Sequence, residues 1–156
     1  MSIVAPTWEI PHATVTLTLL ETLIYYTGAS YSLSLPMPLD GARGWRAFTC
    51  TLAHADATHL FSNMVAQVFL LSLLEYDAGT PAATCIYLIS GLGGSLAQAI
   101  FYSGPPTILL GASGAVFGLI GGNMGTLLLN FESWRAPPLF FLSVLSPSLS
   151  LSLSSP

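Results

Sequence analysis

Four long apolar stretches, separated by short segments rich in proline, glycine and polar residues, constrain the fold of this 156-residue chain more than any other feature. An α-helix needs about 20 apolar residues to cross a bilayer, so a chain of this length has room for about four spans. Only 6% of the residues are charged, against roughly 25% in soluble domains. The sequence therefore predicts an all-α fold, a polytopic membrane helix bundle of about four transmembrane helices. The predicted spans cover residues 13–35, 58–76, 81–102 and 113–131.

The predicted spans divide the chain into three parts. Residues 1–12 form a polar lead-in whose composition, without a basic cluster, fits neither a secretory signal nor a transit peptide. Residues 13–135 form the predicted membrane domain of a multi-pass integral membrane protein. Residues 136–156 form a low-complexity tail of Ser, Leu and Pro, and its apolar run 139–145 is too short to cross a bilayer. We expect this tail to be disordered or to lie at the membrane interface.

The charge and cysteine content exclude several classes of partner. Three Lys and Arg residues against seven Asp and Glu residues give a net charge of −4, so the chain has no basic patch for nucleic acid. Cys50 and Cys85 form no C-x-x-C motif and are interpreted as small packing residues. His54 and His59 do not have the spacing that places two metal ligands on one helical face, and no H-E-x-x-H motif is present. The sequence predicts neither a metal site nor a cofactor.

A single hydroxyl, that of Ser113, lies at the start of a glycine-rich apolar segment. At helical pitch Gly114, Gly118 and Gly122 fall on one stripe, which allows a neighbouring helix to approach almost to backbone contact. Such stripes are common packing devices in membrane helices, whether the contact is within one chain or between two copies. Packing therefore stays open as an interpretation beside that of Ser113 as a nucleophile.

Polar residues follow one face of the second predicted span, where His59, Asn63 and Gln67 are each four residues apart. Short connections make successive spans antiparallel, so the second and fourth spans begin on the same side of the membrane. The polar face is interpreted either as a hydrogen-bonded packing cluster or as a set of donors that stabilise an oxyanion near Ser113.

Other polar residues lie within or beside the spans. Glu21 falls inside the first one, where a lipid-facing charge costs about 3 kcal/mol, so we expect it to face the bundle or to be protonated. Trp45 and Arg46 are typical of a membrane-interface anchor. Glu75 and Gly79 are expected to end a helix and turn the chain.

The ordered combination of these motifs resembles the rhomboid intramembrane serine proteases, over roughly Gly44 to Asn130. The residues that carry the resemblance are Trp45-Arg46, His54, His59-x-x-x-Asn63, Glu75 with Gly79, and Gly111-x-Ser113-Gly114. The resemblance implies that Ser113 is the nucleophile and that His59, Asn63 and the Ser113 amide form the oxyanion hole. It also implies that Trp45 and Arg46 belong to a structured loop, that His54 supports the site and that Glu75 makes a structural contact. The implied reaction is cleavage of transmembrane protein substrates within the lipid bilayer.

One departure from the family pattern concerns the general base. Rhomboid proteases take it from a later helix, in an Ala-His-x-x-Gly-x-x-x-Gly context, whereas the three histidines of this sequence all precede Ser113. A serine without a base is a weak nucleophile, and loss of the base removes several orders of magnitude in rate. We therefore expect an incomplete family member and a poor protease, with His59 acting as a substitute base as the remaining alternative.

Two functions follow from these observations. The first is a rhomboid-like serine endopeptidase, impaired in this chain because no histidine follows Ser113. The second is a catalytically inactive pseudoprotease that binds transmembrane segments and affects their trafficking or degradation. A small channel has little support, because Glu21 has no intramembrane charge to pair with.

Overall fold

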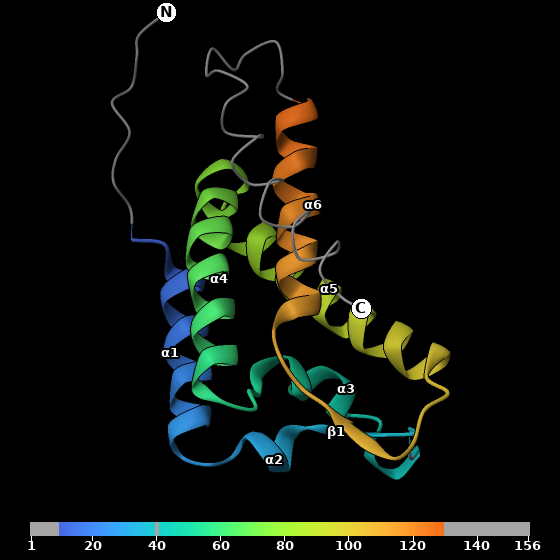
Figure 1. Cartoon of the computed structure of the whole chain (residues 1–156). Coiled ribbons are helices and arrows are strands. Elements are labelled where there is room, and N and C mark those ends of the chain that lie inside the picture. The colour runs from blue at the N-terminus through green and yellow to red at the C-terminus, as the bar shows by residue number, and fades with distance from the viewer. Residues whose placement is uncertain (1–9, 40, 130–156) are drawn as a thin grey trace, which may run out of the picture. The chain divides into compact units, whose positions relative to one another are not determined.

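The part of the chain described by the computed structural model, residues 10–39 and 41–129, is mostly helical (Figure 1). Residues 1–126 form one compact unit and residues 127–156 a second, of which only 127–129 are described. The long helices are α1 His12–Tyr26, α4 Ala57–Ala78, α5 Thr80–Phe101 and α6 Ser113–Leu129. The short elements are α2 Ser30–Leu33, β1 Leu35–Met37, η1 Gly41–Arg43, α3 Arg46–Thr49, η2 Cys50–Leu52 and β2 Thr107–Leu109. The predicted tail, residues 136–156, lies outside the described residues.

Helices α4 and α5 confirm the second and third predicted spans to within two residues at each end. Both are long and apolar enough to cross a bilayer, and α6 is a shorter apolar helix that begins at Ser113 as predicted. Gly79 separates α4 from α5 with a φ of +84°, a left-handed conformation that side chains rarely adopt. Pro81 lies in the first turn of α5, where its missing N–H leaves no bond unmade.

The first predicted span is wrong in length, because α1 ends at Tyr26 instead of continuing to residue 35. The Gly28 N–H donates to the carbonyl of Tyr25, and Gly28 has a φ of +74°, which ends the helix. The apolar residues after this turn enter α2 and β1, and Leu35 is completely buried there. Hydropathy alone does not distinguish apolar residues that continue a helix from apolar residues that are buried after the helix has ended.

Helices α1, α4 and α5 pack against one another through their polar residues as well as their apolar ones. Glu21 is completely buried between them, which confirms that its side chain faces the bundle. At the other end of α1, Glu75 accepts hydrogen bonds from the backbone N–H groups of Ala13 at 2.8 Å and Thr14 at 3.0 Å. The start of α1 is therefore fixed to the end of α4.

Helices α5 and α6 approach closely at glycines. A Cβ added to Gly94 of α5 would lie 3.2 Å from the Cα of Gly114 of α6. One turn further along α6, a Cβ added to Gly118 would lie 2.0 Å from the Cβ of Ser90. The predicted glycine stripe is thus a helix contact within the chain, and it sets α6 antiparallel to α5.

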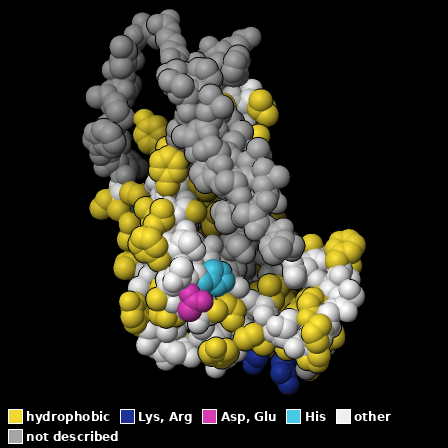
Figure 2. Space-filling view, viewed as in Figure 1, with side chains coloured by type: hydrophobic (Ala, Val, Ile, Leu, Met, Phe, Trp, Pro, Cys, Tyr) yellow, Lys and Arg dark blue, Asp and Glu magenta, His cyan; other side chains and the backbone are white. Residues whose placement is uncertain are grey.

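A small antiparallel sheet, which the sequence did not predict, joins β1 to β2 with Leu35 opposite Leu109. Beneath it Leu35, Met37, Ala47 and Cys50 form a buried apolar cluster. On the face shown in Figure 2, cationic side chains gather at the lower edge, where η1 and α3 lie, and hydrophobic side chains cover the flank over α1 and α4. The sheet connects the segment before α6 to the loop between α1 and α4.

Candidate active site

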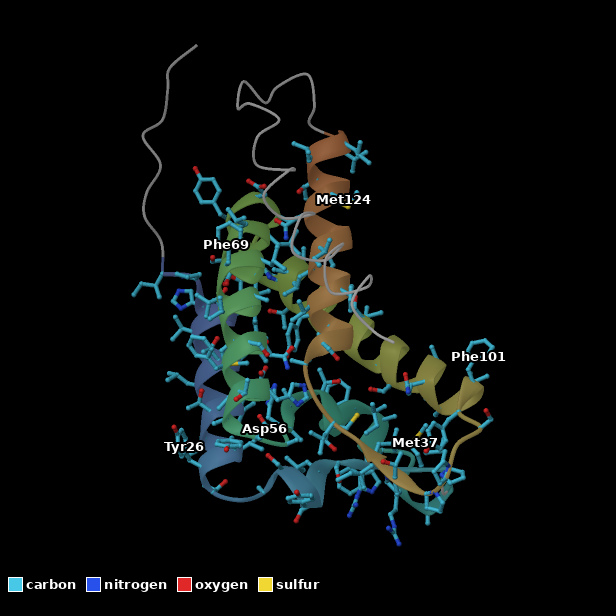
Figure 3. The ribbon with its side chains drawn as sticks, viewed as in Figure 1. Tyr26, Met37, Asp56, Phe69, Phe101 and Met124 are labelled. Atoms are coloured by element: carbon cyan, nitrogen blue, oxygen red, sulfur yellow. The ribbon has the colours of Figure 1, made fainter. Side chains whose placement is uncertain are left out.

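The beginning of α4 sets the orientation of the first polar residues. Asp56 is the N-cap residue, and its carboxylate accepts a hydrogen bond from the His59 N–H at 2.8 Å. Such a cap satisfies one of the unpaired amides of the first turn and fixes where the helix starts. Figure 3 labels Asp56 at this end of α4. His59 is half-buried, and Asn63, one turn later, is buried with its Nδ2 donating to the His59 carbonyl at 3.1 Å. An amide has two N–H groups, so one remains for another acceptor.

The turn before α6 is built around Gly111 and touches His59 directly. Gly111 has a φ of +125°, and a Cβ added to it would lie 2.6 Å from His59 Cε1 and 2.7 Å from His59 Nε2. The imidazole therefore rests on the Cα of Gly111, a place that no other residue type can occupy. This contact brings the polar face of α4 to the segment that leads into Ser113.

Ser113 is the first residue of α6, and its side chain is exposed. Within the described ranges its hydroxyl has no hydrogen-bond partner. Backbone N–H groups in the first turn of a helix have no acceptor within that helix, so they point at whatever lies before it. The start of α6 thus presents a free hydroxyl and free amides on the side where His59 lies, as the antiparallel arrangement predicted.

His54 lies directly behind His59. Its ring makes an edge-to-face contact with the His59 ring, with 5.3 Å between centroids, and its side chain is 1% exposed. Burial, reinforced by the neighbouring His59, lowers the pKa of His54 from 6.5 to about 4. His54 is therefore neutral at physiological pH and packs against the ring that touches Gly111.

The remaining residues singled out in the sequence lie further from Ser113. Arg46 stacks over the exposed Trp45 ring at 5.3 Å from its centroid and donates to the Ser34 carbonyl at 3.4 Å. Glu75 lies at the opposite end of α4 from His59 and contacts α1. Gly114, the residue after Ser113, contacts α5 at Gly94. The structure brings His59, Gly111 and Ser113 into one region, and it places Trp45, Arg46 and Glu75 elsewhere.

One contributor was missed at the sequence level. The Gly111 N–H donates to the backbone carbonyl of Cys50 at 2.9 Å. The prediction of a packing role is confirmed for Cys50, which is buried with its thiol 3.2 Å from the Ser95 hydroxyl, and it is wrong for Cys85, which is exposed. A backbone carbonyl leaves no trace in residue type, so no sequence pattern indicates this contact.

Near the site, an open depression of about 510 Å³ runs along the last turns of α5. The depression begins at Gly94, which lies beside Gly114. Figure 3 labels Phe101 at its far end. Among the described residues, no group of three or more His, Cys, Asp or Glu side chains is arranged to hold a metal ion. The chemistry available here is that of hydroxyl, amide and imidazole groups. The lining residues are Gly94, Ala97, Gln98, Phe101, Tyr102, Ser103 and Gly104.

A comparison with known protein families shows the family of this chain. A family model for the Rhomboid domain matches residues 41–155, which include every element from η1 to α6. The chain belongs to the rhomboid family. Together with the two apolar helices α4 and α5, the rhomboid domain identifies an integral membrane protein.

Known rhomboid proteins show the same relationship. The chain is 37% identical over 99 residues to RHOMBOID-like protein 4 of Arabidopsis thaliana, an alignment that covers 64% of this chain and 25% of the relative. It is 35% identical over 118 residues to the Arabidopsis RHOMBOID-like protein 6, mitochondrial, covering 74% of this chain and 38% of the relative. It is also 34% identical over 92 residues to the Arabidopsis Inactive RHOMBOID-like protein 8, covering 59% and 26%. The chain thus spans well under half the length of these curated relatives.

Proposed function

We propose that this rhomboid carries a serine endopeptidase site for peptide bonds in or near transmembrane segments, with Ser113 as nucleophile. The observation that carries the proposal is the contact of the His59 imidazole with Gly111, two residues before Ser113. This contact supports the proposal because Gly111 leads into the first turn of α6, where the Ser113 hydroxyl is exposed. Hydroxyl groups in that setting support acyl transfer.

In the proposed reaction the Ser113 oxygen attacks the carbonyl carbon of the scissile bond, and the serine proton passes to a base. The negative charge that develops on the carbonyl oxygen is stabilised by His59, Asn63 and the Ser113 N–H. The amine then leaves with a proton, and water hydrolyses the acyl-serine. Donors that are already held in place by Asp56 and Gly111 require no reorganisation when the charge develops.

The same residues support a second candidate function, a pseudoprotease that binds transmembrane segments without cleaving them. The observation that favours it is the similarity to a relative that is named an inactive rhomboid-like protein. Both candidates have a transmembrane segment of another protein as partner, and they differ in whether Ser113 reacts.

A chemical rescue experiment separates the two functions. The purified chain in lipid nanodiscs is treated with a serine-directed fluorophosphonate, with and without free imidazole as an external base. For the protease site we expect slow labelling that imidazole accelerates and that Ser113→Ala abolishes. Ser72→Ala is the matched control, because the Ser72 hydroxyl bonds to its own helix at the Val68 carbonyl.

The possible outcomes distinguish the two candidate functions and test whether Ser113 is the nucleophile. Labelling that persists in Ser113→Ala means that a different serine reacts, and it contradicts the proposed nucleophile. No labelling at any imidazole concentration leaves the binding function, which photo-crosslinking to a transmembrane peptide then tests. Rapid labelling without imidazole means that a base is already present, and His59→Ala would then show whether His59 supplies it.

A further inference from the structure

A second polar cluster lies inside the bundle, away from Ser113, and joins three helices. Its centre is Glu21 of α1, whose Oε1 accepts a hydrogen bond from the Tyr87 hydroxyl of α5 at 2.6 Å. Gln67 of α4 completes it, with Nε2 donating to Thr18 Oγ1 of α1 at 3.4 Å. Glu21, Gln67 and Tyr87 are all completely buried. Neither candidate function uses this cluster.

Two oxygen atoms of the cluster have no donor. Glu21 Oε2 and Gln67 Oε1 are both buried and have no hydrogen-bond partner among the described residues. An ionised carboxylate and an amide oxygen only accept hydrogen bonds, so with the Gln67 amide oriented as it is in the structure the ionised form leaves both atoms unsatisfied. Each unsatisfied buried polar atom destabilises the folded state, because it has lost its hydrogen bonds to water without gaining a protein partner.

A proton on Glu21 satisfies both atoms at once. Protonation turns Oε2 into a donor, and Gln67 Oε1 is the buried acceptor that lacks one. The hydrogen bonds then run in one direction, from Tyr87 to Glu21, from Glu21 to Gln67, and from Gln67 to Thr18. Apart from the second amide hydrogen of Gln67, every polar hydrogen and every carboxyl or amide oxygen of the three buried side chains then has a hydrogen-bond partner.

The charges around the cluster also favour the neutral acid. Helices α1, α4, α5 and α6 contain no Lys or Arg over their described residues, so none of these four helices offers a cation to an ionised Glu21. On α4 the nearest ionisable groups are His59 and Glu75, each about two turns from Gln67. On α5 the facing titratable group is Tyr87 itself. An uncompensated carboxylate within a membrane bundle is strongly destabilising.

We propose that Glu21 is an intramembrane proton-binding site, protonated at neutral pH with its Oε2–H donating to Gln67 Oε1, and that proton release loosens α1 from α4 and α5. The site takes one proton from water and returns it, with no other bond made or broken. The folded bundle then holds a proton that the unfolded chain releases at neutral pH. Its stability therefore falls as the pH rises from the range in which an unfolded glutamate ionises, and it levels off once the folded site has released its proton.

Infrared spectroscopy of the chain in nanodiscs tests the proposal directly. We expect a carboxylic-acid carbonyl band at neutral pH that is absent in Glu21→Gln and unchanged in the matched control Asp77→Asn, whose side chain is exposed. Tyr87→Phe keeps the ring and removes the hydrogen bond to Oε1, so it should shift this band to higher frequency. A wild-type spectrum without the band at neutral pH overturns the proposal, as does a band that Tyr87→Phe does not move.

Thermal unfolding in detergent supplies the second measurement. Gln is a mimic of the protonated acid, since its carbonyl accepts from Tyr87 and its NH₂ donates to Gln67. Glu21→Gln should therefore unfold within a few degrees of wild type in acidic solution, lose the decline that wild type shows as the pH rises, and be at least as stable as wild type at neutral pH. If Glu21→Gln unfolds far below wild type at neutral pH, the fold requires an ionised Glu21 and the proposal fails. Both measurements are independent of any reaction at Ser113.

Discussion

The backbone N–H of Gly111 donates to the carbonyl of Cys50 at 2.9 Å, and this hydrogen bond joins the turn before Ser113 to the loop before α4. The sheet between β1 and β2 makes a second connection between the same two segments. The position of Ser113 relative to His59 is therefore determined by backbone contacts as well as by the packing of α5 against α6.

Gly111→Ala tests this arrangement. The substitution should lower the melting temperature and abolish labelling of Ser113, because a side chain at a φ of +125° is strained by about 1–3 kcal/mol and its Cβ would overlap the His59 ring. Fluorophosphonate labelling and thermal unfolding measure the two effects. Gly44→Ala is the control, since its Cβ would make only an ordinary contact at 3.6 Å. Unchanged labelling in Gly111→Ala would show that the His59 contact does not position Ser113.

Asn63→Ala tests the oxyanion assignment. If Asn63 stabilises the developing negative charge, the substitution should slow imidazole-assisted labelling of Ser113 by roughly 100-fold and have little effect on binding of a transmembrane peptide. Ser62→Ala, at an exposed position beside it, should change neither. Equal loss of peptide binding and of labelling, together with a lower melting temperature, would identify Asn63 as a packing residue.

The sequence predicted α4 and α5 well because polar residues or turn-forming glycine and proline bound each of them. Asp56 caps the start of α4, and Gly79 and Pro81 separate it from α5. The same signals placed Ser113 at the beginning of α6 and put it on the side where His59 lies. Local chemistry determined these features, so local patterns were enough to find them.

Other features depend on contacts between distant segments. The three residues of β2 become a strand only because β1, about 70 residues earlier, offers them a partner. The end of α1 at Tyr26 depends on where the next residues can be buried, which hydropathy does not report. The Cys50 carbonyl is a backbone group, and its role in holding Gly111 is visible only in three dimensions.

Gly118→Ala tests the contact between α5 and α6. The new Cβ would lie 2.0 Å from the Cβ of Ser90, and rotating the Ser90 side chain cannot relieve an overlap with its Cβ. We expect the two helices to move apart. Overpacking of this kind costs about 1–3 kcal/mol of stability, so the melting temperature should fall. Gly121→Ala is the matched control, because nothing lies within 4 Å of its Cβ position. Equal melting temperatures for the two variants would contradict the observed crossing.

Glu75→Ala tests the anchor of α1. In addition to its bonds from α1, the Glu75 carboxylate accepts from the Thr80 hydroxyl at 2.6 Å, so it holds three helices together. Hydrogen bonds to charged groups contribute about 1.5–3 kcal/mol each, and we expect the free energy of unfolding to fall by at least that much. Asp77→Asn, two residues away and exposed, should have little effect. Similar unfolding of the two variants would show that α1 is held by other contacts.

His54 should make the stability of the protein depend on pH in mildly acidic solution. Burial, with the neighbouring His59, lowers the pKa of His54 from 6.5 to about 4, so the unfolded chain takes up a proton in this range before the folded one does. Stability is therefore full above pH 6.5 and declines as the pH falls toward 4. His54→Gln removes this contribution, so the difference in melting temperature between wild type and variant should shrink as the pH falls through the window. His12→Gln is the matched control for loss of a histidine, at an exposed position in the first turn of α1. A wild-type profile parallel to that of His54→Gln would mean that His54 takes up its proton equally in the folded and unfolded states.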